Sequence, residues 1–135
     1  MRVYIPATFG MLQALQDNEL LHARSGWGFS ATKALHDFFV SGDEEEIEAV
    51  AFDDAALASL RLLAIGDEER FPHRRVVVSA DVPDSQATPD PEMGESVVKL
   101  SAPVNLEDIA AIHVDIAEAE EATAKAIEVI DAADL

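Results

Sequence analysis

The chain has no cysteine among its 135 residues, so it can form no disulfide bond and offers no thiolate to zinc or to a substrate. Basic residues are also scarce: nine lysines and arginines stand against 27 aspartates and glutamates, which gives a formal net charge of -18. This charge repels phosphate backbones and anionic lipid head groups. Direct binding to nucleic acid or to a membrane surface is therefore disfavoured.

The chain also lacks a long apolar segment. No apolar run reaches the roughly 18 residues that a membrane-spanning helix requires, and Pro6 interrupts the N-terminus where a signal peptide would place its apolar region. We therefore expect a cytoplasmic protein. The 49% hydrophobic and 27% charged residues are typical of a globular chain, and the length predicts a single domain over residues 1–135.

Four segments have the residue pattern of β-strands: residues 3–5, 76–82, 97–100 and 112–115. Pro6 is expected to stop the first strand. The second holds three consecutive valines and ends before Pro83, which predicts a strand in the interior of the sheet, and the fourth is also expected there. Residues 83–96 contain three prolines and predict a long exposed connection.

Helical periodicity predicts four helices, over residues 9–17, about 32–41, 43–65 and from about 117 onwards, with a single helical turn at 106–108. Thr8 is expected to cap the first helix, Ser30 or Thr32 the second, and Asp43 the third. The glutamates that follow Asp43 suit the first turn of a helix, where the helix dipole favours negative charge.

Apolar side chains predict how these helices pack. The second helix is expected to turn Leu35, Phe38 and Phe39 toward the core. The third helix carries two apolar stripes in its C-terminal half: Leu57, Leu60 and Leu63, and Ala58, Leu62 and Ile65. We therefore expect the third helix to be the most buried of the four.

The order of these elements predicts an α+β fold, in which a small mixed or antiparallel β-sheet packs against helices as a single-domain sandwich. A ferredoxin-like layout is one candidate topology, but the sequence lacks the regular strand–helix–strand rhythm of that fold.

Four stretches carry a family resemblance: Met1-Arg-Val-Tyr-Ile-Pro-Ala-Thr8, Ala58-Ser-Leu-Arg-Leu-Leu-Ala64, Arg74-Arg-Val-Val-Val-Ser-Ala-Asp-Val82 and Ile109-Ala-Ala-Ile-His-Val-Asp115. Together they resemble a family of uncharacterised proteins of unknown function from high-GC actinobacteria, over nearly the whole chain. The resemblance implies no activity, ligand or catalytic residue, because that family has no established reaction. Similar proteins continue past Leu135, which implies that this chain lacks a C-terminal extension such as a final strand.

His113 and Asp115 are the first candidate site residues. They stand two apart on an expected strand, so their side chains share a face and can hold a metal or a proton between them. Asp81, at the end of another strand, can add a carboxylate. The alternative is a partly buried histidine that is hydrogen-bonded to its neighbours. Because two ligands do not make a metal site, we assign no metal and no cofactor.

Arg61 and Trp27 are the other candidates for binding. Arg61 lies among leucines, so its charge must reach water, pair with a carboxylate, or join Arg74 and Arg75 in binding an anion. Trp27 lies between two glycines, which predicts a loop. Its ring either contacts a protein partner or folds back onto the core.

The sequence favours a non-enzymatic cytoplasmic interaction or accessory protein, because it contains neither a G-x-S-x-G elbow nor a glycine-rich phosphate loop. Its acidic surface is suited to a protein partner, and self-association is also open. The alternative is a small metal- or anion-dependent enzyme that uses His113, Asp115 and Asp81. A third hypothesis is a phosphate mimic, which requires carboxylates spaced along one surface.

Overall fold

The computed structural model describes residues 1–39, 42–65 and 74–115, and its main feature is a six-stranded antiparallel sheet. The strand order is β5-β6-β3-β1-β4-β8. Its strands are β1 (Arg2–Ala7), β3 (Trp27–Phe29), β4 (Val76–Asp81), β5 (Ala87–Pro89), β6 (Val97–Leu100) and β8 (Ile109–Val114). Two short strands, β2 (Leu20–Leu21) and β7 (Val104–Asn105), pair separately as a small ribbon.

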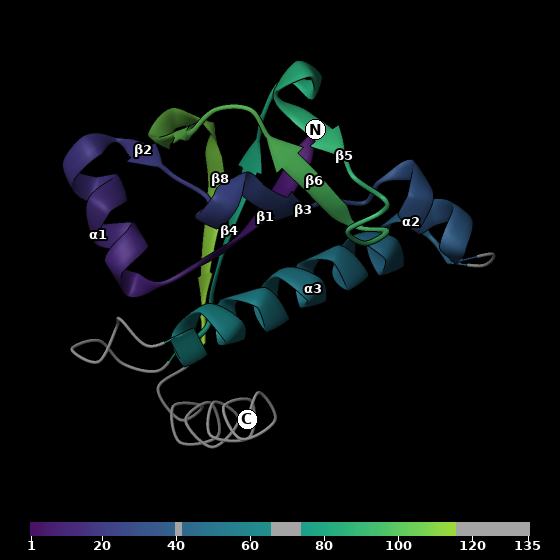
Figure 1. Cartoon of the computed structure of the whole chain (residues 1–135), viewed down its shortest axis with the longest axis horizontal. Helices are drawn as coiled ribbons and strands as arrows, with labels where there is room; N and C mark the ends of the chain where they lie inside the picture. The colour runs from purple at the N-terminus through teal and green to yellow at the C-terminus, as the bar shows by residue number, and fades with distance from the viewer. Residues whose placement is uncertain (40–41, 66–73, 116–135) are drawn as a thin grey trace.

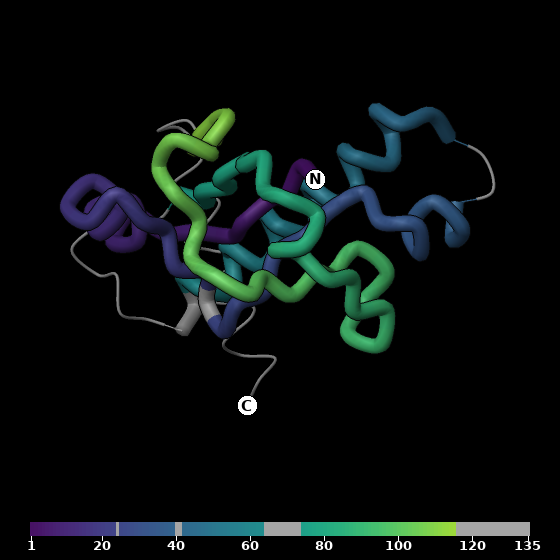
Figure 2. Tube along the Cα trace, turned by 90° about the horizontal axis from the view of Figure 1, so that it is seen from above, coloured from purple at the N-terminus to yellow at the C-terminus, as the bar shows by residue number. Residues whose placement is uncertain are grey.

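Three helices accompany the sheet: α1 (Phe9–Asn18), α2 (Lys33–Phe38) and α3 (Glu44–Ile65). Short 3-10 turns are η1 (Arg24–Gly26), η2 (Asp84–Gln86) and η3 (Leu106–Asp108). Figure 1 shows α3 running across the sheet, with α1 at one end of the molecule and α2 at the other, and Figure 2 agrees. The predicted α+β fold is confirmed.

The pairing of β1 with β4 forms the middle of the sheet. The two strands stay in register from Arg2 opposite Asp81 to Ala7 opposite Val76. The valine-rich strand is therefore interior, as predicted. Pro6 does not end β1, because it pairs opposite Val77, while β3 pairs with β1 only at Tyr4.

One face of the sheet is covered by α1 and the β2–β7 ribbon. The buried residues of this first core cluster are Val3, Ile5, Ala7, Leu15, Leu21, Val76, Val78, Ala80, Val82, Ala87, Val98, Leu100 and Val104. Thr8 caps α1, as predicted, by accepting a hydrogen bond from the Met11 N–H at 3.3 Å. Leu21 pairs opposite Val104, so the ribbon brings two apolar side chains onto this face.

The opposite face is covered by α2 and α3. The buried residues of this second core cluster are Tyr4, Leu35, Ile47, Ala51, Ala55 and Val77. The buried positions of α3 recur every four residues and are small toward its middle, which lets the helix backbone approach the strands. The two predicted leucine stripes imply burial around most of the C-terminal half of α3. That implication is wrong, because Leu57 is 44% exposed and only one side of α3 is buried.

Ser59 fastens α3 to the sheet. Its hydroxyl donates to the Ala7 carbonyl at 2.8 Å and accepts from the Val76 N–H at 2.9 Å. Ser59 is fully buried, and its two partners lie at the paired ends of β1 and β4. One hydroxyl therefore satisfies one backbone group on each of two strands.

The short length of α2 overturns another expectation. Thr32 caps it, as predicted, and Leu35 is buried, but Phe38 and Phe39 are both exposed. The helix has only six residues, and the backbone of Phe39 is already extended, with φ -96 and ψ 103. One and a half turns can bring only the Leu35 side onto the sheet.

Several other expectations need correction. The stretch 83–96 is not only a loop, because it contains β5, which pairs with the following strand β6. The strand near residue 112 is β8, which lies at the edge of the sheet and not in its interior. The described elements do not follow the β-α-β-β-α-β order of a ferredoxin-like layout, because four sheet strands follow α3 without another α-helix between them. The helix expected from residue 117 lies outside the described residues.

Candidate functional site

His113 lies on β8 against α3 and the neighbouring strand β4. Its Nε2 is 3.0 Å from the Ser79 hydroxyl, and its ring meets the Phe52 ring edge-on at a centroid distance of 4.9 Å. Ser79 is buried beneath the imidazole, whereas His113 is exposed. The histidine is therefore held by one strand neighbour and one helix neighbour.

Asp115, just past the end of β8, forms an ion pair with Arg75 on the neighbouring strand side. Its carboxylate accepts from Arg75 Nε at 2.8 Å, from Arg75 Nη2 at 3.1 Å and from the Arg75 backbone N–H at 2.9 Å. The Asp115 N–H in turn donates to the Arg75 carbonyl at 3.1 Å. These contacts fix the ends of β4 and β8 together.

The electrostatics of this pair follow from its geometry. Burial alone raises the pKa of Asp115, but the hydrogen bonds and charge of Arg75 outweigh it, so the pKa lies below its ordinary value. The hydrogen bond to Asp115 raises the pKa of Arg75 against the opposing effect of burial, and the charge of Asp53 adds to the rise. Both groups are ionised at neutral pH.

A cleft of about 210 Å³ opens between α3 and β8 beside this pair. It is lined by Phe52, Asp53, Ala56, Arg75, Val77, His113, Val114 and Asp115. Ser79, whose hydroxyl contacts His113, is buried and is not among these lining residues. The Arg75 charge is already neutralised by Asp115. The cleft therefore holds the exposed imidazole of His113 beside an ion-paired guanidinium.

The remaining sequence candidates lie elsewhere. Asp81 is at the other end of β4, where its carboxylate accepts from Arg2 Nε at 2.6 Å and Nη2 at 2.9 Å, and this pair lowers the pKa of Asp81. Arg61 is exposed on α3. The structure therefore brings His113 and Asp115 together but does not bring Asp81 or Arg61 to them.

Trp27 lies in strand β3 and not in a loop. It pairs opposite Lys99 on β6, whose Nζ lies 4.4 Å from the centre of the indole ring and donates to the Ser25 carbonyl. The ring is half-buried. Trp27 is thus occupied by a cation–π contact within the fold.

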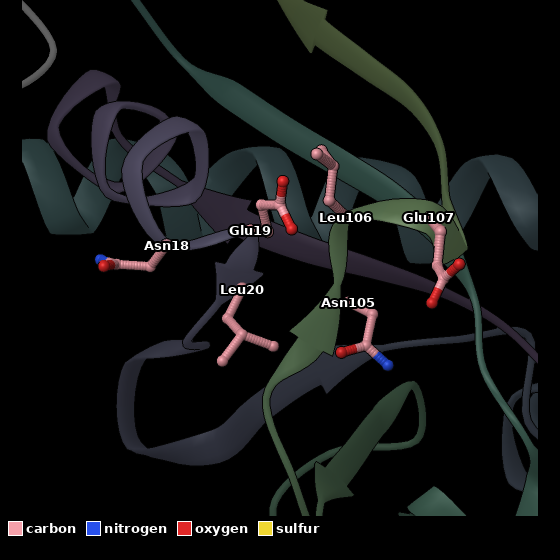
Figure 3. A pocket seen from close by; sticks show the side chains of 6 residues that line it. All are labelled: Asn18, Glu19, Leu20, Asn105, Leu106 and Glu107. Carbon is pink, nitrogen blue, oxygen red and sulfur yellow. The ribbon is translucent and has the colours of Figure 1, made fainter.

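A second hollow, of about 470 Å³, lies between the C-terminal end of α1 with the start of β2 on one side and β7 with η3 on the other. Its lining consists of Asn18, Glu19, Leu20, Asn105, Leu106 and Glu107, and Figure 3 shows that the Asn18 side chain points away from the others and that the two carboxylates do not converge. In residues 1–39, 42–65 and 74–115, no group of three or more histidines and acids is placed to hold a metal ion.

The whole chain, residues 1–135, matches the profile of a family of unknown function, DUF6912. The protein belongs to this family. The predicted membership of an uncharacterised family is thereby confirmed, and its function is unknown. No curated protein and no solved structure gives a significant match to this DUF6912 member. Within its described residues, no helix combines the length and the apolar character needed to cross a bilayer.

Phe38 and Phe39 are the most exposed aromatic residues among those that the structure describes in this DUF6912 member, whereas the sequence predicts them in the core. Phe38 is 63% exposed and packs edge-on against Phe39 at a centroid distance of 5.1 Å. We call these two residues the aromatic patch.

The Arg75–Asp115 pair leads to a pH-dependent prediction. Asp115→Asn is expected to lower the free energy of unfolding by about 1 kcal/mol at neutral pH. Because the folded pKa lies below the unfolded value of roughly 3.9, the stabilisation is complete above that pH and is lost as the pH falls through the folded pKa. Urea unfolding curves of the variant and the natural protein should therefore converge upon acidification.

The control for this prediction is Glu92→Gln, which removes an exposed carboxylate in the turn after β5. It should change stability little at any pH. A difference between Asp115→Asn and the natural protein that stayed constant down to about pH 2 would show that the pair does not stabilise the fold through its charge.

Proposed function

We propose that this protein is a non-enzymatic cytoplasmic interaction protein that docks a basic protein partner through the aromatic patch. The observation that carries this proposal is the 63% exposure of Phe38, a large apolar side chain that already contacts a second partly exposed ring. Burial of such rings by a partner is strongly favourable, and aromatic residues dominate the energetics of protein interfaces.

The surroundings of the patch are acidic. Figure 1 shows α2 beside the N-terminal end of α3, and His36 Nε2 on α2 lies 3.1 Å from the Glu44 carboxylate on α3. The exposed acids here are Asp37, Asp43, Glu44, Glu45 and Glu46. Lys33 on α2 lies 3.0 Å from the Asp37 carboxylate, which neutralises its charge within the helix. The patch is therefore an apolar centre within a negative rim.

This combination defines the chemistry of the partner. An apolar pocket bordered by lysines or arginines would cover the rings and neutralise the rim. Nucleic acid does not fit, because its phosphates would meet the carboxylates. A phosphate mimic is less well supported, because the exposed acids are distributed over the ends of α1, α3, β4 and η3 and do not follow one line.

An enzymatic role is the weaker alternative. Arg75, which lines the cleft beside His113, is neutralised by Asp115, and Asp81 lies at the far end of β4. The His113 side chain is also occupied by Ser79 and Phe52. These contacts suit a role in holding β8 to β4 and α3.

The double variant Phe38→Ser, Phe39→Ser tests the proposal. Proteins captured by the natural chain are identified by mass spectrometry and purified, and their dissociation constants are measured by calorimetry. The double variant should bind the true partner at least about 30-fold more weakly, because interface aromatics commonly contribute about 2 kcal/mol or more. Binding should also weaken as salt is raised, because the rim attracts basic groups.

Met93→Ser is the matched control, because Met93 is 60% exposed but lies in the turn between β5 and β6. It should leave the affinity unchanged. The proposal fails if every purified candidate binds the double variant as tightly as the natural protein.

A further inference from the structure

We draw no further inference here: the strongest candidate, the exposed apolar margin that Ile112 and Val114 form on the edge strand β8, carries nothing, because nothing in the part of the chain that the structure describes shows what covers it.

Discussion

Replacing Ser59 with alanine is expected to lower the free energy of unfolding by about 3 kcal/mol. The hydroxyl donates to the Ala7 carbonyl and accepts from the Val76 N–H, so its removal leaves two backbone groups without a partner in a fully buried site. Each such group costs roughly 1–3 kcal/mol. Chemical denaturation monitored by circular dichroism measures the loss.

Ser85→Ala is the control for Ser59→Ala, because Ser85 is an exposed serine in η2. It should change stability by less than about 0.5 kcal/mol. If Ser59→Ala behaved like Ser85→Ala, α3 would not be fastened to β1 and β4 through this hydroxyl, and the packing of that face would need revision.

Leu21→Ala is expected to cost about 3 kcal/mol, which is comparable to the loss at Ser59. Leu21 is buried in the first core cluster and pairs opposite Val104, so its truncation leaves a cavity between the β2–β7 ribbon and the sheet. Thermal and urea unfolding should both show the effect.

Its neighbour Leu20 provides the comparison, because it lies on the same two-residue strand but is only partly buried. Leu20→Ala should cost at most about 1 kcal/mol. Equal losses at the two positions would mean that the ribbon does not cover the sheet in the described way.

The strands and caps that the sequence predicts correctly depend on local physics. The valines of β4 favour a buried strand whatever surrounds them, and Thr8 and Thr32 satisfy helix N–H groups three residues away. The register of Pro6 and the edge position of β8 depend instead on which distant segments pair. Sequence spacing alone carries no information on that choice.

Helix burial was predicted less well, for a related reason. Leu57 and Phe38 are apolar and stand at helical spacing from other apolar residues, which predicts that they face the core. A helix that lies close to a sheet instead buries small residues, as Ala51 and Ala55 do, and leaves some large ones outside. The distance between helix and sheet is a tertiary property and cannot be inferred from periodicity.

The candidate site was likewise predicted only where local spacing decides the arrangement. His113 and Asp115 were placed on one face from their spacing, and they do line one cleft. The partners that give them their roles, Ser79 and Arg75, come from the neighbouring strand, and the pairing of β4 with β8 brings them there. Asp81 was assigned to the same cluster because the sequence does not show which end of β4 lies beside His113.

The most direct test of the docking proposal is site-specific photo-cross-linking in cells. A benzophenone amino acid at position 38 should form an adduct with a basic protein, which the same probe at position 93 does not form, and high salt during irradiation of a lysate should abolish it. If the adducts from positions 38 and 93 were the same, or if position 38 gave none, the aromatic patch would not be the surface through which this protein acts.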